Sequence, residues 1–168
     1  MNVPARTPDL RFLFAHPAHL IACGFGSGLA PVAPGTFGTL FAWASFIPLS
    51  RVLPELALLV VIGVAFVLGV LACQRTGQAL GVVDHGSIVW DEIVPFWLVL
   101  VLTPNDWRWQ LAAFLLFRVF DITKPPPANY FDQKVKNGFG VMMDDVVAAF
   151  YTLLALAAGK RLIEAFGW

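Results

Sequence analysis

Apolar residues in this chain gather into long runs separated by short polar turns. The longest run, residues 56–73 (LALLVVIGVAFVLGVLAC), is uncharged throughout. At the helical rise of 1.5 Å per residue it would extend about 27 Å, close to the hydrocarbon thickness of a bilayer. The pattern therefore predicts a transmembrane helix at this position.

Four further apolar runs are shorter, at residues 36–49, 93–103, 109–117 and 146–159. The turn residues of PNDWR (104–108) separate two of these runs, and Lys160 and Arg161 follow the last one. Strand-type alternation is nearly absent. We therefore expect an all-α fold, a compact membrane-embedded bundle of about four to six helices. Residues 1–168 should form one domain.

Two segments are predicted to be non-helical. One is the glycine- and proline-rich stretch 26–38 (GSGLAPVAPGTFG), and the other follows Phe120, where three prolines at 125–127 stop a helix. The first is either a tight re-entrant loop that packs helices or a loop whose backbone approaches a ligand. In the second case Ser27, Gly35 and Thr36 are substrate-binding candidates. No Gly-Lys-Ser/Thr follows, so it is not a Walker loop.

Composition supports the membrane assignment. Hydrophobic residues make up 58% of the chain and charged residues 13%, against about 25% in soluble domains. The formal net charge is zero, and no basic patch is interleaved with aromatic residues, so we expect no nucleic-acid partner. Cys23 and Cys73 lie in apolar sequence and are expected to be buried and reduced. The N-terminus lacks a signal-peptide pattern and is expected to be retained.

Six of the eleven acidic residues fall in short clusters flanked by apolar sequence: Asp84, Asp91, Glu92, Asp121, Asp144 and Asp145. If 84–92 is helical, Asp84 and Asp91 share one face, and Asp84 could cap the helix. Asp91 and Glu92 would then lie beyond the first turn and lead into an apolar run. A charge at the bilayer centre costs about 2.5–3.5 kcal/mol or more, so these acids require a partner or a metal.

The other two clusters each have two interpretations. Arg118, Asp121 and Lys124 are spaced by three, which suits either a surface ion-pair ladder or a phosphate site with an Arg fork and a Lys point charge. Asp144 and Asp145 could cap a helix, but one acid suffices for a cap. A dication between adjacent acids would offset their repulsion, and Mg²⁺ prefers such oxygen ligands together with substrate phosphate.

Several other chemistries lack their residues. The histidines at 16, 19 and 85 have no zinc-site spacing and are expected to be structural or merely exposed. No cysteine is followed by five residues and then an arginine, and FDITK contains one aspartate where dehalogenase-type phosphatases carry two. Water activated by a metal is the remaining route to phosphate hydrolysis.

Four motifs in order resemble the phosphatidylglycerophosphatase A family, over about residues 20–155. They are GFGSGLAPVAPGTFGTL (24–40), IVWDEIV (88–94), FRVFDITKPPP (117–127) and GFGVMMDDVVAAF (138–150). The sequence departs from the family pattern at Pro95, Asn137 and Ala149, which should affect packing more than ligands. The resemblance implies a Mg²⁺-dependent lipid phosphatase of bacterial phospholipid biosynthesis. Its substrate would be phosphatidylglycerophosphate and its product phosphatidylglycerol.

The resemblance also implies roles for single residues. The catalytic and metal-binding set would be Asp91, Glu92, Asp121, Asp144 and Asp145. Arg118 and Lys124 would neutralise the phosphate, and Asp84 is a weaker candidate for general base or support. The segment 124–136 carries three lysines and one aspartate, so it should face the cytoplasm and meet anionic headgroups at the inner membrane.

Two other functions stay open on these residues alone. Buried acids in membrane helices also mark small ion- or proton-coupled transporters, although we find few confident spans and no internal repeat. A non-catalytic lipid-binding or scaffold protein is the third alternative, but it leaves the ordered acidic clusters without a purpose. The sequence does not determine the oligomeric state.

Overall fold

The computed structural model describes residues 7–166, which form helices and, within that range, no strand. In chain order the elements are α1 (Leu10–Ala15), α2 (Pro17–Ala22), the 3₁₀ segment η1 (Gly24–Leu29), α3 (Pro34–Val52), α4 (Glu55–Leu80), α5 (Trp90–Leu102), α6 (Trp107–Thr123), α7 (Ala128–Lys134) and α8 (Gly138–Ala165). The expected all-α fold is confirmed. The helices outnumber the expected four to six because α1, α2, η1 and α7 are short and lie outside the long apolar runs.

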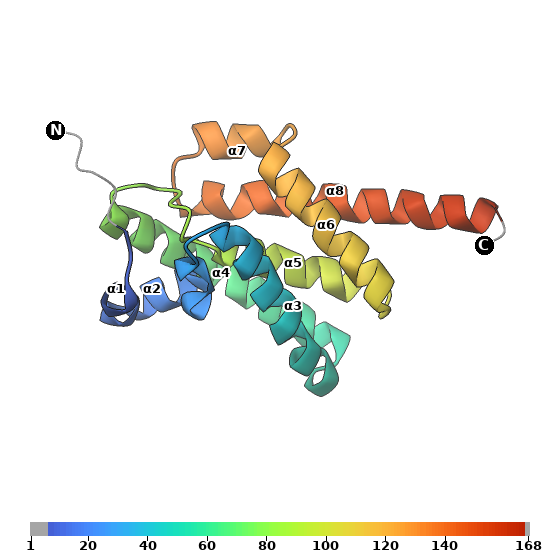
Figure 1. The fold of residues 1–168 in the computed structure, drawn as a ribbon, viewed down its shortest axis with the longest axis horizontal. Coiled ribbons are helices and arrows are strands. Elements are labelled where there is room, and N and C mark those ends of the chain that lie inside the picture. Colours follow the sequence, from blue (N-terminus) through green and yellow to red (C-terminus); the bar gives the residue numbers. More distant parts are fainter. Residues whose placement is uncertain (1–6, 167–168) are drawn as a thin grey trace.

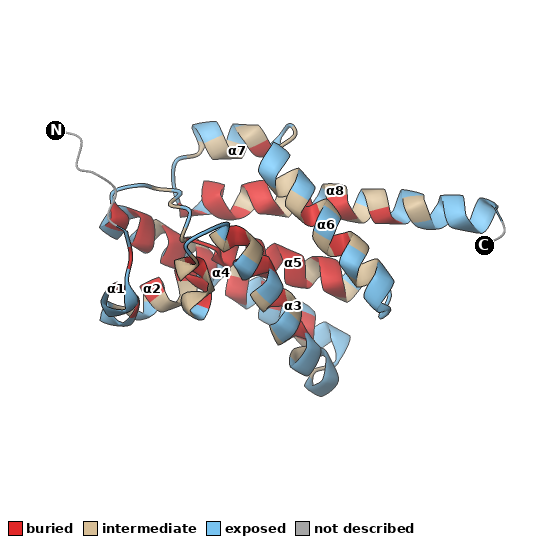
Figure 2. Cartoon of the chain, viewed as in Figure 1, coloured by how far each residue is buried: buried red, intermediate tan, exposed pale blue. Residues whose placement is uncertain are grey.

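Helix α5 is the centre of the bundle, with α3, α4, α6 and α8 packed around it (Figure 1). Its sequence WDEIVPFWLVLVL is apolar on every side after the first turn, so it is buried on every side. Figure 2 shows that the buried residues concentrate around this helix and the neighbouring half of α8. The opening turn of α5 therefore lies inside the protein, and the acids it carries are placed there too.

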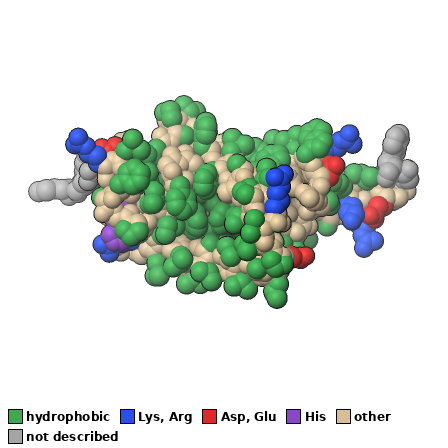
Figure 3. All heavy atoms as spheres, turned by 90° about the horizontal axis from the view of Figure 1, so that it is seen from below, with side chains coloured by type: hydrophobic (Ala, Val, Ile, Leu, Met, Phe, Trp, Pro, Cys, Tyr) green, Lys and Arg blue, Asp and Glu red, His purple; other side chains and the backbone are tan. Residues whose placement is uncertain are grey.

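Two helices of the described chain, α4 and α8, are long and apolar enough to cross a membrane. The predicted span 56–73 lies within α4, and the run 146–159 lies within α8, which begins eight residues earlier at Gly138. Only 33% of the most apolar window of α4 is buried, so most of its apolar side chains face outward. The face drawn in Figure 3 is largely hydrophobic, as a surface in contact with lipid would be.

The prediction that 26–38 is non-helical is wrong for much of that stretch. Residues 24–29 form η1, and α3 already begins at Pro34, whose ring suits the first helical position. Positive φ angles at Gly24, Phe25 and Gly26 turn the chain sharply between α2 and α3. A side chain at Gly28 would collide with the carbonyl of Ser87, which shows that this turn packs against the approach to α5.

Small residues let α8 approach α4 closely. A side chain at Gly69 would collide with Trp90 and Met142, and one at Gly138 would collide with the backbone carbonyl of Val70. The Gly138 amide also donates to the side chain of Gln74 at 2.6 Å. This contact determines where α8 begins, and thereby where the two acids in its second turn lie.

We predict that Gly138→Ala lowers stability by about 1–3 kcal/mol, because its new methyl meets backbone that cannot move aside. The matched control is Gly159→Ala on the same helix. Nothing lies within 4 Å of its added Cβ, so alanine there should be stabilising by about 0.5–1 kcal/mol. The measurement is the thermal unfolding midpoint in one detergent. An unchanged midpoint in Gly138→Ala would contradict the close α4–α8 contact.

Candidate active site

A cavity of about 240 Å³ opens where α5, α6 and α8 meet the connection between α4 and α5. Its lining contains all five acids of the predicted catalytic set, both predicted phosphate-binding cations and the weaker candidate: Asp84, Asp91, Glu92, Arg118, Asp121, Lys124, Asp144 and Asp145. These residues come from segments up to sixty positions apart. The fold thus brings together what the sequence left scattered.

Asp91 and Glu92 enter the cavity from the first turn of α5, and both are buried. The helix considered over 84–92 begins only at Trp90, because Gly81 ends α4 with a left-handed residue and the connection at 81–89 is not helical. The two acids therefore do lie in a first turn, where the helix dipole favours negative charge. Trp90, which donates to the carbonyl of Ala65 at 3.0 Å, fixes the rotation of this turn.

Arg118 joins the acids of two helices. Its Nη1 lies 3.0 Å from Oε1 of Glu92 and 2.6 Å from Oδ2 of Asp121. The Arg118–Asp121 pair has the i,i+3 spacing of the surface ladder, but its side chains are only 15% and 11% exposed. Burial leaves little water to screen these pairs, so the Coulomb attraction within them is stronger than in a surface pair, while the desolvation of both charges opposes it.

Thr39 is a site residue that the sequence analysis missed. Its hydroxyl donates to the carbonyl of Gly35 at 2.9 Å, accepts from Nη1 of Arg118 at 3.4 Å and lies 3.5 Å from Oε2 of Glu92. It is fully buried on the first turns of α3. The only signal was the repeated threonine in GTFGT, of which Thr36 was chosen.

The structure separates Ser27 and Thr36 from the acids. The hydroxyl of Ser27 donates to the carbonyl of Gly24 at 2.8 Å, within the same turn, and Thr36 does not line the cavity. Gly35 does take part, because Glu92 occupies the space where a side chain at Gly35 would stand. Of the three residues predicted from this segment, Gly35 alone touches a cavity-lining acid among the contacts described.

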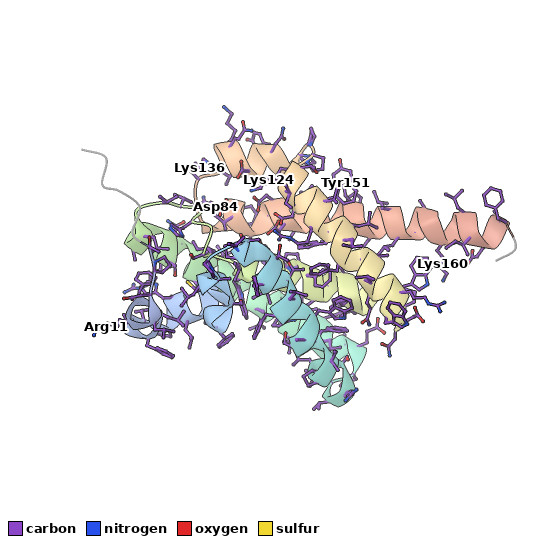
Figure 4. All side chains as sticks on the ribbon, viewed as in Figure 1. Arg11, Asp84, Lys124, Lys136, Tyr151 and Lys160 are labelled. Carbon is purple, nitrogen blue, oxygen red and sulfur yellow. The ribbon has the colours of Figure 1, made fainter. Side chains whose placement is uncertain are left out.

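Lys124 is the second cation of the cavity. It ends α6 in the left-handed conformation, with φ of 42°, which is unfavourable for a residue with a side chain and is often found at functional sites. Its Nζ lies 2.6 Å from Asp144, 2.7 Å from Asp132 and 3.7 Å from Asp84. Burial alone would lower the pKa of Lys124, but the charge of Asp144 and the bonds to Asp132 and Asp144 outweigh burial and raise it. Figure 4 shows Lys124 beside Asp84.

The helix-cap interpretation of Asp144 and Asp145 is excluded. The cap of α8 is Asn137, whose side chain accepts from the amide of Gly140 at 3.0 Å, and the two acids lie a full turn and more beyond it. Both are buried. Asp144 pairs with Lys124, whereas Oδ1 of Asp145 is a buried atom without a hydrogen-bond partner.

The cavity is short of positive charge. Six lining carboxylates face two cations, and Oδ1 of Asp91 is, like that of Asp145, buried without a partner. Burial raises the pKa of Asp91, and it raises the pKa of Glu92 to about 8 although the charge of Arg118 opposes it. Carboxylate oxygens of Glu92, Asp121 and Asp145 lie within 4.8 Å of one another. A dication with oxygen ligands fits this set.

The remaining predicted structural residues behave as expected. Cys23 and Cys73 are buried and free. His19 stacks on Phe12 and shares a hydrogen bond with Thr76, and His16 caps α2.

The chain is similar to bacterial proteins that carry the names of phosphatases. A phosphatidylglycerophosphatase A of Haemophilus influenzae is 49% identical over 90% of this chain and 93% of that protein. A phosphatidylglycerophosphatase A of Escherichia coli is 45% identical over 88% of each. A putative phosphatidylinositol-3-phosphatase of Bacteroides thetaiotaomicron is 40% identical over 86% of this chain and 94% of that protein. No solved structure matches.

The fold and the acid-lined cavity, with these relatives, define the class: the chain is a membrane-associated phosphatase, a phosphoric monoester hydrolase. The family model for phosphatidylglycerophosphatase A matches residues 20–160. The chain therefore belongs to the phosphatidylglycerophosphatase A family, and the resemblance found in its motifs is confirmed.

We predict that Gly35→Ala lowers phosphatase activity about tenfold or more, because the methyl would displace the carboxylate of Glu92. Gly63→Ala, on α4, is the control, since nothing lies within 4 Å of its added Cβ and activity should persist. The measurement is phosphate release per folded protein. Equal activity in the two variants would show that the placement of Glu92 against α3 is unimportant.

Proposed function

We propose that this protein hydrolyses the terminal phosphate of phosphatidylglycerophosphate to give phosphatidylglycerol in phospholipid biosynthesis, with Mg²⁺ as cofactor. The names of the relatives at 49% and 45% identity support this substrate. The observation that carries the proposal is the convergence of six carboxylates and two cations on one cavity, with two buried carboxylate oxygens left without partners.

The residues proposed to hold Mg²⁺ are those of the predicted set: Asp91, Glu92, Asp121, Asp144 and Asp145. They offer only oxygen ligands, which Mg²⁺ prefers, and the unpartnered oxygens of Asp91 and Asp145 are the atoms that lack a cation. When bound, Mg²⁺ would neutralise these acids, polarise a phosphate oxygen and lower the pKa of a bound water.

The two cations act on the phosphate. Phosphoryl transfer spreads negative charge over the equatorial oxygens, so fixed positive groups around them are stabilising for the transition state. Arg118 is held in place by Glu92 and Asp121, and its Nε is buried without a partner, which leaves a donor for a phosphate oxygen. Lys124, which pairs with Asp144, supplies a second, point-like positive charge. Asp84 lines the cavity with a side chain that is 36% exposed, and it is a candidate to accept the proton of the attacking water.

The arrangement suits a lipid substrate. Lys124 lies in the cavity, and Lys134 and Lys136 follow on and after α7. Cytoplasmic segments are enriched in lysine, and lysines attract anionic headgroups. We therefore propose that the cavity faces the cytoplasm at the bacterial inner membrane, with the acyl chains beside the apolar helices. The three relatives carry the names of phosphatases, so they favour phosphate hydrolysis over the alternative of ion-coupled transport.

The direct test is hydrolysis of phosphatidylglycerophosphate by the purified protein in detergent micelles. We expect phosphate release with Mg²⁺ and none with a chelator. Asp145→Asn should lower kcat/KM by at least about 100-fold, because it removes a ligand charge from the cavity. Glu164→Gln, an exposed acid near the end of α8, is the matched control and should be fully active. Chelator-resistant hydrolysis would exclude the metal, and near-normal Asp145→Asn would exclude this aspartate.

The affinity for divalent cations should rise with pH. Because burial raises the pKa of Glu92 to about 8, its carboxyl holds a proton at neutral pH when no cation is bound, and that proton must leave on binding. Affinity should increase by up to about tenfold per pH unit from pH 6 and level off above pH 8. Isothermal titration with Mg²⁺ at several pH values measures this slope, and Glu92→Gln should reduce it. An affinity independent of pH would contradict the assignment.

A further inference from the structure

We propose that Asp132 of α7 is a positioning residue for Lys124. The acid group Asp84, Asp132 and Asp144 then binds the lysine ammonium and does not by itself hold a second metal ion; Asp144 stays in the set proposed for the Mg²⁺ of the cavity. Neither the motifs of the sequence nor its relatives drew attention to Asp132. The inference rests on the proposed function, since Lys124 is the residue taken to neutralise the phosphate.

The lysine is held from three directions. Asp144 lies on α8, Asp132 on α7 and Asp84 on the connection between α4 and α5. Their oxygens lie 2.6, 2.7 and 3.7 Å from Nζ of Lys124. An ammonium has three donors; two are hydrogen-bonded, to Asp132 and Asp144, and Asp84 lies farther away, which leaves the third donor for a phosphate oxygen. The side chain of Lys124 is 27% exposed and its backbone is in a strained conformation, so the geometry depends on these bonds.

Six of the acids in and beside the cavity form two groups that differ in how far positive charge already neutralises them. Glu92, Asp121 and Asp145 form one set within 4.8 Å, and Asp84, Asp132 and Asp144 form the other. Two buried carboxylate oxygens lack partners; that of Asp145 belongs to the first set, whereas Asp91 belongs to neither set. In the second group every carboxylate already contacts the ammonium. Of the two groups, only the first therefore has a buried carboxylate oxygen that still lacks a partner.

Helix α7 is docked so that Asp132 is presented to the lysine. The hydroxyl of Tyr151 donates to the carbonyl of Pro126 at 2.6 Å, which ties the start of α7 to α8. The rings of Phe131, midway along α7, and Phe139 of α8 pack edge to face. Asp132 thus reaches Lys124 from a helix that is held against α8 at its start and at its middle.

Removing the charge of Asp132 would leave Lys124 with one close partner, Asp144. A salt bridge to one buried acid holds the ammonium against that acid and away from the phosphate. Substrate binding should suffer first, so KM should rise. Partial unfolding would behave differently, because it lowers kcat per mole of protein and leaves KM unchanged.

The experiment compares Asp132→Asn, Asp132→Glu and the control Glu164→Gln in detergent, using the full chain. We expect Asp132→Asn to raise KM for the lipid phosphate about tenfold, while the number of Mn²⁺ ions bound stays the same and their affinity changes by less than about threefold. Asp132→Glu should restore most of the loss, and Glu164→Gln should show no change. Mn²⁺ binding is measured by electron paramagnetic resonance without substrate.

Lys124→Met supplies an independent arm. Without the ammonium, the second acid group should accept a cation, so one more Mn²⁺ should bind than in the unsubstituted protein. This count holds even if Asp132→Asn fails to fold. Loss of one bound Mn²⁺ in Asp132→Asn, no gain in Lys124→Met, or an unchanged KM in Asp132→Asn would each overturn the proposal. Absence of hydrolysis by the unsubstituted protein would instead refute the proposed function. The numbers of bound Mn²⁺ ions would still test whether the second acid group binds the ammonium of Lys124.

Discussion

The structure depends on neutralising buried carboxylates inside a protein that has few charges. Six acids share one cavity with two cations, and the nearest contacts are 2.6–3.0 Å pairs to Arg118 and Lys124. An uncompensated charge away from water is expensive, so each helix that carries an acid must meet a helix that carries a counter-charge. This requirement links α5, α6 and α8 more specifically than apolar packing could, because apolar packing tolerates small shifts.

Glycine residues allow the helices that carry these charges to approach one another closely. Glu92 lies in the space that a side chain at Gly35 would need, and Gly138 brings α8 onto the backbone of α4. Both contacts sit within a turn or two of an acid of the cavity. Packing and electrostatics are therefore one constraint here, since an ion pair at 3 Å depends on helix axes that glycine allows to approach. The fully buried Thr39 completes the contact by lying between Glu92 and Arg118.

The long helices and most of the acids were predictable from the sequence, because each produces a local signal. Apolar runs identified α4, α5, α6 and α8. An acid next to an apolar run is unusual in any orientation of the helix, so it can be recognised from the sequence. The start of α5 was not predictable, since Asp84 has the features of a helix cap and only the tertiary fold shows that the helix begins at Trp90. Thr39 was missed because its hydroxyl gains a role only when α3 packs on α5. Asp132 was missed because an acid among lysines in a polar segment resembles an ordinary surface residue.

The position of the cavity follows from the same distribution of charge. The face of the bundle drawn in Figure 3 is largely apolar, whereas Asp84, Lys124 and Asp132 lie in or beside the connections between helices. A dianionic headgroup cannot be drawn into hydrocarbon without its counter-charges, and acyl chains cannot leave hydrocarbon cheaply. A phosphatase with this surface can meet a lipid phosphate only where those two environments adjoin. In the proposed function, the acids would make the site selective for a metal cation, and Arg118 and Lys124 would allow a phosphate to approach so many acids.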